Sequence, residues 1–134
     1  MDVPTAFASI AVAAVFWDGR LTMAGSRALR HSLDYRKPFS GYDDTRMIDI
    51  MDRLVSELRH KGAQHMMIDA ATVLKPDQRM TAFAVAAEIM RSDGSYQEDE
   101  LNILSNLATV LALDDAFTFE VMRVMDVLHS DVLT

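Results

Sequence analysis

Two stretches of the chain carry one pattern: IAVAAVFWDGRLTMAGSRAL at residues 10–29 and VAAEIMRSDGSYQEDELNIL at residues 85–104. They superpose without a gap, and in each an alanine-rich apolar run leads to Asp-Gly and then to a second helical pattern. We call the two Asp-Gly turns, Asp18-Gly19 and Asp93-Gly94, the elbows. The repeat predicts two helical hairpins, each bent at an elbow and related to the other by a pseudo-twofold axis.

The rest of the chain has helical spacing as well. Apolar residues recur every three or four positions between glycine, proline and aspartate breaks, and no stretch alternates with the two-residue period of a strand. We therefore expect an all-α fold of about seven helices, organised as a single domain over residues 1–134. The expected helices cover approximately residues 6–17, 22–33, 44–61, 63–74, 78–92, 98–113 and 115–128.

The alanine-rich runs should form the centre of this domain. A helix that is apolar on all sides must be buried, and small side chains let two helices approach closely. We expect residues 11–14 to contact residues 84–87. Glu88 interrupts the second run, and a buried carboxylate is costly unless it is paired, so pairing with an arginine is expected, with a role as a ligand as the alternative.

Composition excludes several classes of function. The chain has no cysteine, which rules out disulfides, thiolate zinc sites and a cysteine nucleophile. Its net charge of −7 argues against unaided binding to nucleic acid, which needs a basic surface. The apolar run at residues 6–17 is too short to span a bilayer and has no positive residue before it, unlike a signal peptide. These features favour a cytoplasmic protein.

The charge is divided unevenly along the chain. Residues 1–67 have a net charge of +1, whereas residues 68–134 have a net charge of −8. A local basic cluster in the first half is either a solvated face or a dock for an acidic partner or anionic lipid. Its members are Arg20, Arg27, Arg30, His31, Arg36 and Lys37.

The acids of the second elbow admit two interpretations. In the structural one, Gly19 and Gly94 end helices in a left-handed conformation. Ser95 and Glu98 then form a capping box for the next helix, whose positive dipole end favours acids.

In the second interpretation the elbows meet, and Asp18, Asp93 and Glu100 converge on a divalent cation. Ca²⁺ or Mg²⁺ suits carboxylates better than Zn²⁺, because the four histidines lack zinc-site spacing. An EF-hand is excluded, since its first and third ligand positions would be Ile89 and Arg91.

The second elbow and its flanks, AAEIMRSDGSYQEDELNILSNLATVLAL at residues 86–113, resemble the second half of the TerB-like, tellurite-resistance-associated domain. The first hairpin is similar to a degenerate first repeat of that family. The resemblance implies a pseudo-symmetric, all-helical bacterial protein of stress or tellurite response. It further implies work in a membrane-associated complex, peripheral to the inner membrane, without demonstrated catalysis. The family's acidic cluster maps onto Asp18, Asp93 and Glu100, and the chain departs where Gly25 replaces an acid.

Three functions are compatible with these features. The first is a non-enzymatic interaction or sensor domain, whose acidic surface binds a divalent cation or a basic protein partner. The second is a metal-dependent enzyme using the same carboxylates, although no nucleophile-and-base set is visible. The third is a structural helical module that forms a homodimer through its apolar surface.

Overall fold

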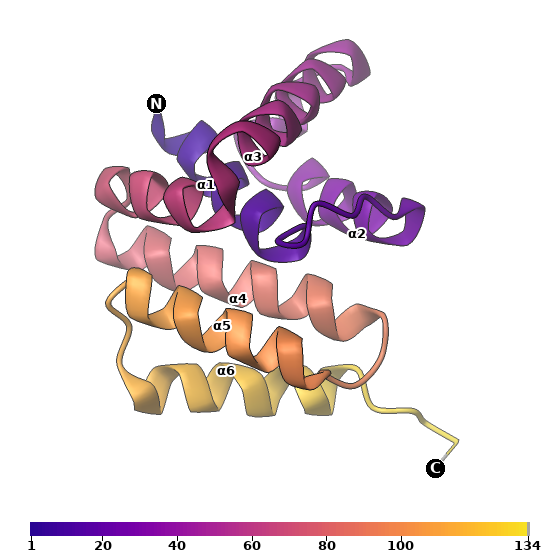
Figure 1. The fold of residues 1–134 in the computed structure, drawn as a ribbon. Coiled ribbons are helices and arrows are strands. Elements are labelled where there is room, and N and C mark those ends of the chain that lie inside the picture. Colours follow the sequence, from indigo (N-terminus) through magenta and orange to yellow (C-terminus); the bar gives the residue numbers. More distant parts are fainter. Residues whose placement is uncertain (134) are drawn as a thin grey trace.

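The computed structural model describes residues 1–133, which form six α-helices and no strand (Figure 1). The predicted all-α class is confirmed. No helix in this range is both long enough and apolar enough to cross a membrane. The helices are α1 (Val3–Val15), α2 (Met23–Asp34), α3 (Asp44–Val73), α4 (Pro76–Ser92), α5 (Glu98–Val110) and α6 (Asp115–Leu128), with a short 3-10 turn, η1 (Phe39–Gly41), before α3.

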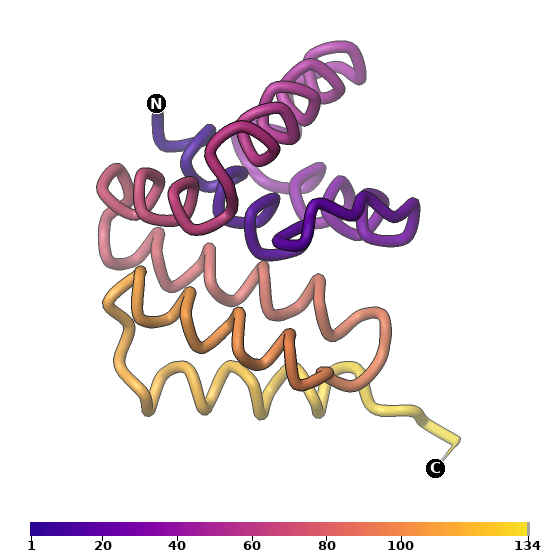
Figure 2. Tube along the Cα trace, viewed as in Figure 1, coloured from indigo at the N-terminus to yellow at the C-terminus, as the bar shows by residue number. Residues whose placement is uncertain are grey.

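Helix α3 explains why residues 1–133 contain six α-helices where about seven were expected. The sequence predicts a helix end at Gly62, and this glycine does leave the helical conformation, with φ 82° and ψ 161°. However, the chain re-enters a helix at once, so a kink replaces the expected connection. Figure 2 shows the trace turning sharply there, with the first half of α3 projecting from the rest of the molecule.

Helix α1 lies at the centre, as its apolar composition predicts. Its residues 8–14 are all buried, and the helix packs mainly against α3 and α4. Asp2 caps its first turn by accepting a hydrogen bond from the Thr5 amide at 2.9 Å. Only the two ends of α1 reach the surface, so its middle turns serve to hold the other helices together.

Helix α4 is the second central element, and it contacts α1, as the repeat predicts for these two helices. Residues 85–87 of α4 are buried, and α4 also contacts α2, α5 and α6. The pseudo-twofold relation between the whole hairpins stays a prediction. The predicted pairing of Glu88 with an arginine is wrong. Within residues 1–133, no Lys or Arg nitrogen lies within 4.0 Å of its carboxylate. Glu88 is half-buried, and its carboxylate reaches the surface.

Helices α4, α5 and α6 form the lower part of the view in Figure 1, beneath α1, α2 and α3. Arg79 of α4 joins these parts through its guanidinium, which donates to the carbonyls of Leu74 at 3.0 Å, Ala71 at 2.6 Å and Leu111 at 3.4 Å. Farther along α4, Arg91 pairs with Asp126 of α6 at 2.9 Å. Long cationic side chains on α4 therefore fix α3, α5 and α6 around it.

Candidate functional site

The two elbows are built on positive-φ glycines, as the sequence predicts. Gly19 has φ 77° and Gly94 has φ 137°, values that favour a residue without a Cβ atom. In the first elbow, Asp18 Oδ1 accepts from the Arg20 amide at 3.0 Å. In the second, the Gly94 amide donates to the Arg91 carbonyl at 3.1 Å. Each hairpin thus turns at a short, locally hydrogen-bonded bend.

A surface cavity of about 380 Å³ lies between the elbows. The three carboxylates singled out from the sequence, Asp18, Asp93 and Glu100, all line it, although they come from different repeats. Trp17, Arg20 and Asp99 lie on its wall as well, and the sequence analysis missed their part in it. The remaining lining residues are Val15, Thr22, Gly25, Ile89, Met90 and Gln97.

The cavity wall is negatively charged. It carries four carboxylates, those of Asp18, Asp93, Asp99 and Glu100, and one guanidinium, that of Arg20. The guanidinium is 86% exposed and its Nε lies 4.0 Å from Asp18, so this ion pair is in solvent and weak. Consequently the wall favours a cationic group.

Most of these carboxylates also hold the backbone. Glu100 Oε1 accepts from the Gln97 amide at 2.9 Å, and Asp99 Oδ1 accepts from the Glu100 amide at 2.8 Å. Asp93 is different: within residues 1–133 its side chain makes no hydrogen bond or ion pair by our distance criteria. Its carboxylate is therefore the one most available to a ligand.

The predicted capping box of Ser95 and Glu98 is wrong by two residues. Helix α5 begins at Glu98, so Gln97 is the N-cap residue and Glu100 occupies the third helical position. The Glu100 carboxylate returns to the Gln97 amide, as the last residue of a capping box does. Glu100 therefore has a structural role beside its place in the cavity.

Sharing a cavity does not make these carboxylates a metal centre. Among residues 1–133, no three His, Asp or Glu side chains come close enough together to hold a metal ion. Gly25, where the TerB-like pattern has an acid, supplies no side-chain ligand either. A Cβ atom added at Gly25 would lie 2.9 Å from Thr22 Oγ1 and 3.1 Å from the Phe16 ring. A carboxylate therefore cannot replace Gly25 without displacing its neighbours.

Tyr96 locks the second elbow onto α4. Its hydroxyl donates to the Ala87 carbonyl at 2.8 Å, so the ring covers the end of the helix that precedes it. Burial, followed by the negative charge of Asp126, raises the pKa of Tyr96 to about 12. Leu21, at the equivalent position of the first repeat, is 42% exposed. The sequence marked both positions as apolar and did not distinguish them.

Four cations of the predicted basic cluster lie at different features of the surface. Arg20 lines the elbow cavity, whereas Arg30 pairs with Asp34 at 3.3 Å and with Asp44 at 3.1 Å. Arg36 and Lys37 border a different cavity, of about 440 Å³. These cations therefore serve separate surfaces.

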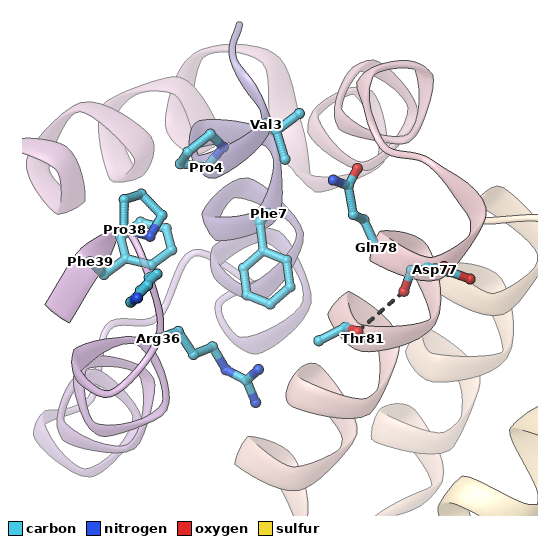
Figure 3. A pocket seen from close by; sticks show the side chains of 10 residues that line it. Val3, Pro4, Phe7, Arg36, Pro38, Phe39, Asp77, Gln78 and Thr81 are labelled. Carbon is cyan, nitrogen blue, oxygen red and sulfur yellow. Dashed lines mark hydrogen bonds between the residues drawn. The ribbon is translucent and has the colours of Figure 1, made fainter.

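The second cavity lies between the first turns of α1 and α4 and the chain before η1 (Figure 3). Phe7 points into it, with the Arg36 guanidinium 5.8 Å from the ring centre. Arg36 Nε donates to the Ser32 carbonyl at 3.1 Å, and Asp77 on the opposite wall opposes the positive charge. Mixed charges around an apolar wall define no ligand class, so the elbow cavity is the better candidate site.

No family model, curated protein or solved structure matches this chain. The TerB-like resemblance accordingly stays a prediction from the motif at residues 86–113.

Proposed function

We propose that the chain is a non-enzymatic interaction or sensor domain whose elbow cavity receives a cationic group. The observation that carries this proposal is the meeting of carboxylates from both repeats, Asp18 with Asp93 and Asp99, at one cavity. We assign the cavity first to a Lys or Arg side chain of a partner protein. Such a group needs surrounding negative charge, whereas a metal ion needs close ligand geometry.

A divalent cation is the second candidate, because Ca²⁺ and Mg²⁺ accept carboxylate and water ligands together. The TerB-like resemblance supports placing either form in a bacterial stress or tellurite-resistance system, within a membrane-associated complex. A metal-dependent enzyme using the same carboxylates would require a bound metal, so metal titration tests that alternative too.

Trp17 offers a direct measurement, because it is the single tryptophan of the chain and lines the cavity. We expect trilysine to change Trp17 fluorescence with a dissociation constant of about 10⁻⁴–10⁻³ M, typical of a weak, exposed charged site. Ca²⁺, Mg²⁺ and Zn²⁺ are titrated separately. Saturation by Ca²⁺ or Mg²⁺ without trilysine binding would reverse the order of the two candidates.

Asp93→Asn and Glu98→Gln form a matched pair of variants. Both remove one exposed negative charge beside the same helix, but only Asp93 lines the cavity. We expect Asp93→Asn to weaken trilysine binding several-fold, whereas Glu98→Gln leaves it nearly unchanged. Equal weakening by both variants would show general charge attraction, and no response to any cation would remove the elbow cavity as a binding site.

A further inference from the structure

The outer face of α6 carries large exposed apolar side chains, which is unusual for a helix at the edge of a molecule. Phe119, on the edge of this face toward α5, is 72% exposed, and Val127 is 66% exposed. Leu128 is also exposed, but it lies seven residues after Val121 and therefore on that residue's side of the helix. Phe117 and Val121 pack against the core from the opposite side of the helix. Figure 1 shows α6 at the lower edge, with no other element beneath it. The helix therefore has an apolar face in the core and two large apolar side chains, Phe119 and Val127, on its solvent side.

Two unpaired opposite charges lie on this outer face. Glu120 and Arg123 are both exposed, and within residues 1–133 neither side chain makes a hydrogen bond or ion pair. They cancel in charge, so the face adds nothing to the repulsion between two chains of net charge −7. A neutral apolar strip with one acid and one base is compatible with a surface that binds its own copy.

The register of such a pair follows from helix geometry. When two α6 helices run antiparallel about a twofold axis level with the peptide between residues 121 and 122, Glu120 of each copy faces Arg123 of the other. In this register the small Ala116 of each copy faces Val127 of the other. Moving the axis to residue 120 or to residue 123 places like charges opposite each other. Charge thus selects one register over its neighbours.

We propose that α6 forms a homodimer interface, in which two copies pair antiparallel through Phe119, Val127 and reciprocal Glu120–Arg123 ion pairs. The interface lies apart from the elbow cavity, which no residue of α6 lines. The dimer and the proposed cation binding are therefore tested independently.

Sedimentation velocity tests the proposal with the full chain. We expect wild type to pass from monomer to dimer between about 1 µM and 1 mM, since self-association depends on concentration. Phe119→Ser should weaken the dimer at least ~10-fold, because the largest apolar side chain of the interface is lost. Ile48→Ser is the matched control: Ile48 is also exposed, at 53%, but lies on α3. A monomeric wild type, or a dimer lost only in Ile48→Ser, would overturn the proposal.

Charge reversal tests the register. Glu120→Arg places Arg opposite Arg across the axis, and Arg123→Glu places Glu opposite Glu, so each variant alone should be monomeric. Mixing the two variants restores both ion pairs, and a heterodimer should form. Circular dichroism checks folding, and Phe119→Ser remains as a test if either charge variant fails to fold. Folded variants that dimerise alone, or a mixture that stays monomeric, would overturn the register.

Discussion

At the scale of the residue, Tyr96 makes the two copies of the repeat unequal. Both copies have an apolar residue two positions after the elbow glycine, but only Tyr96 can donate a hydrogen bond, and it does so to Ala87 at 2.8 Å. The Leu21 side chain has no hydrogen-bond donor, and it is partly exposed. The second elbow is consequently held by a side chain, whereas the first depends on backbone and Asp18 contacts.

The raised pKa of Tyr96 predicts a dependence on alkaline pH. The folded pKa is about 12, against an ordinary value of 10.0, so the folded state favours the protonated phenol. Its contribution to stability is complete below pH 10 and is lost as pH rises through 12. Absorbance titration should show one late-ionising tyrosine that disappears in Tyr96→Phe.

The matched control for this titration is Tyr35→Phe, because Tyr35 is 80% exposed. The late step should persist in that variant. If Tyr96→Phe instead removes absorbance change only near pH 10, the buried hydroxyl is not the source of the late step.

At the scale of the element, the end of α5 carries a strained residue. Ala112 has φ 55°, in the region that L-residues occupy at a cost and glycine occupies freely. The Leu113 amide donates to the Ala108 carbonyl and the Ala112 amide to the Thr109 carbonyl, both at 3.0 Å. This pattern is a Schellman motif, which commonly has glycine at the position of Ala112.

We therefore expect Ala112→Gly to raise the free energy of unfolding by about 0.5–1 kcal/mol. The control is Ala116→Gly, at an exposed helical position of α6, which should lower it by up to about 1 kcal/mol. Urea denaturation measures both variants. Destabilisation by Ala112→Gly would mean that the positive φ is relieved in solution.

The ends of elements were also where sequence reasoning was least accurate. Periodic apolar spacing identified the helices, because burial of one face decides them. A helix N-cap, by contrast, is defined by a single hydrogen bond, and several polar residues can make it. Before α5 both Ser95 and Gln97 are candidates for the N-cap position. The spacing from Ser95 therefore predicted that Glu98 is the acid of the capping box, whereas in the structure that acid is Glu100.

At the scale of the whole molecule, the internal repeat predicts that the two elbows lie close together. It predicted the contact between α1 and α4, and the structure adds that Asp18, Asp93 and Glu100 border one cavity. The arrangement of carboxylates around that cavity was not predictable, because it depends on backbone direction at each elbow. Arg79 was missed because its partners are backbone carbonyls, which no side-chain pattern reveals.

Arg79 gives the clearest prediction at this scale. Its guanidinium satisfies carbonyls at the ends of both α3 and α5, and cations favour the negative end of a helix. Arg79→Met leaves those carbonyls without this donor, and hydrogen bonds from charged groups contribute about 1.5–3 kcal/mol each. Since the three bonds share one side chain, we expect a loss of about 2–4 kcal/mol in unfolding free energy.

Two further variants separate this role from ordinary loss of charge. Arg79→Lys keeps the charge but lacks the planar fork that reaches three carbonyls, so it should recover only part of the stability. Arg53→Met removes an exposed arginine paired with Asp49 at 3.2 Å, and should cost less than about 1 kcal/mol. Comparable urea midpoints for Arg79→Met and Arg53→Met would contradict this role of Arg79, because they would mean that the contact between α3 and α5 holds without it.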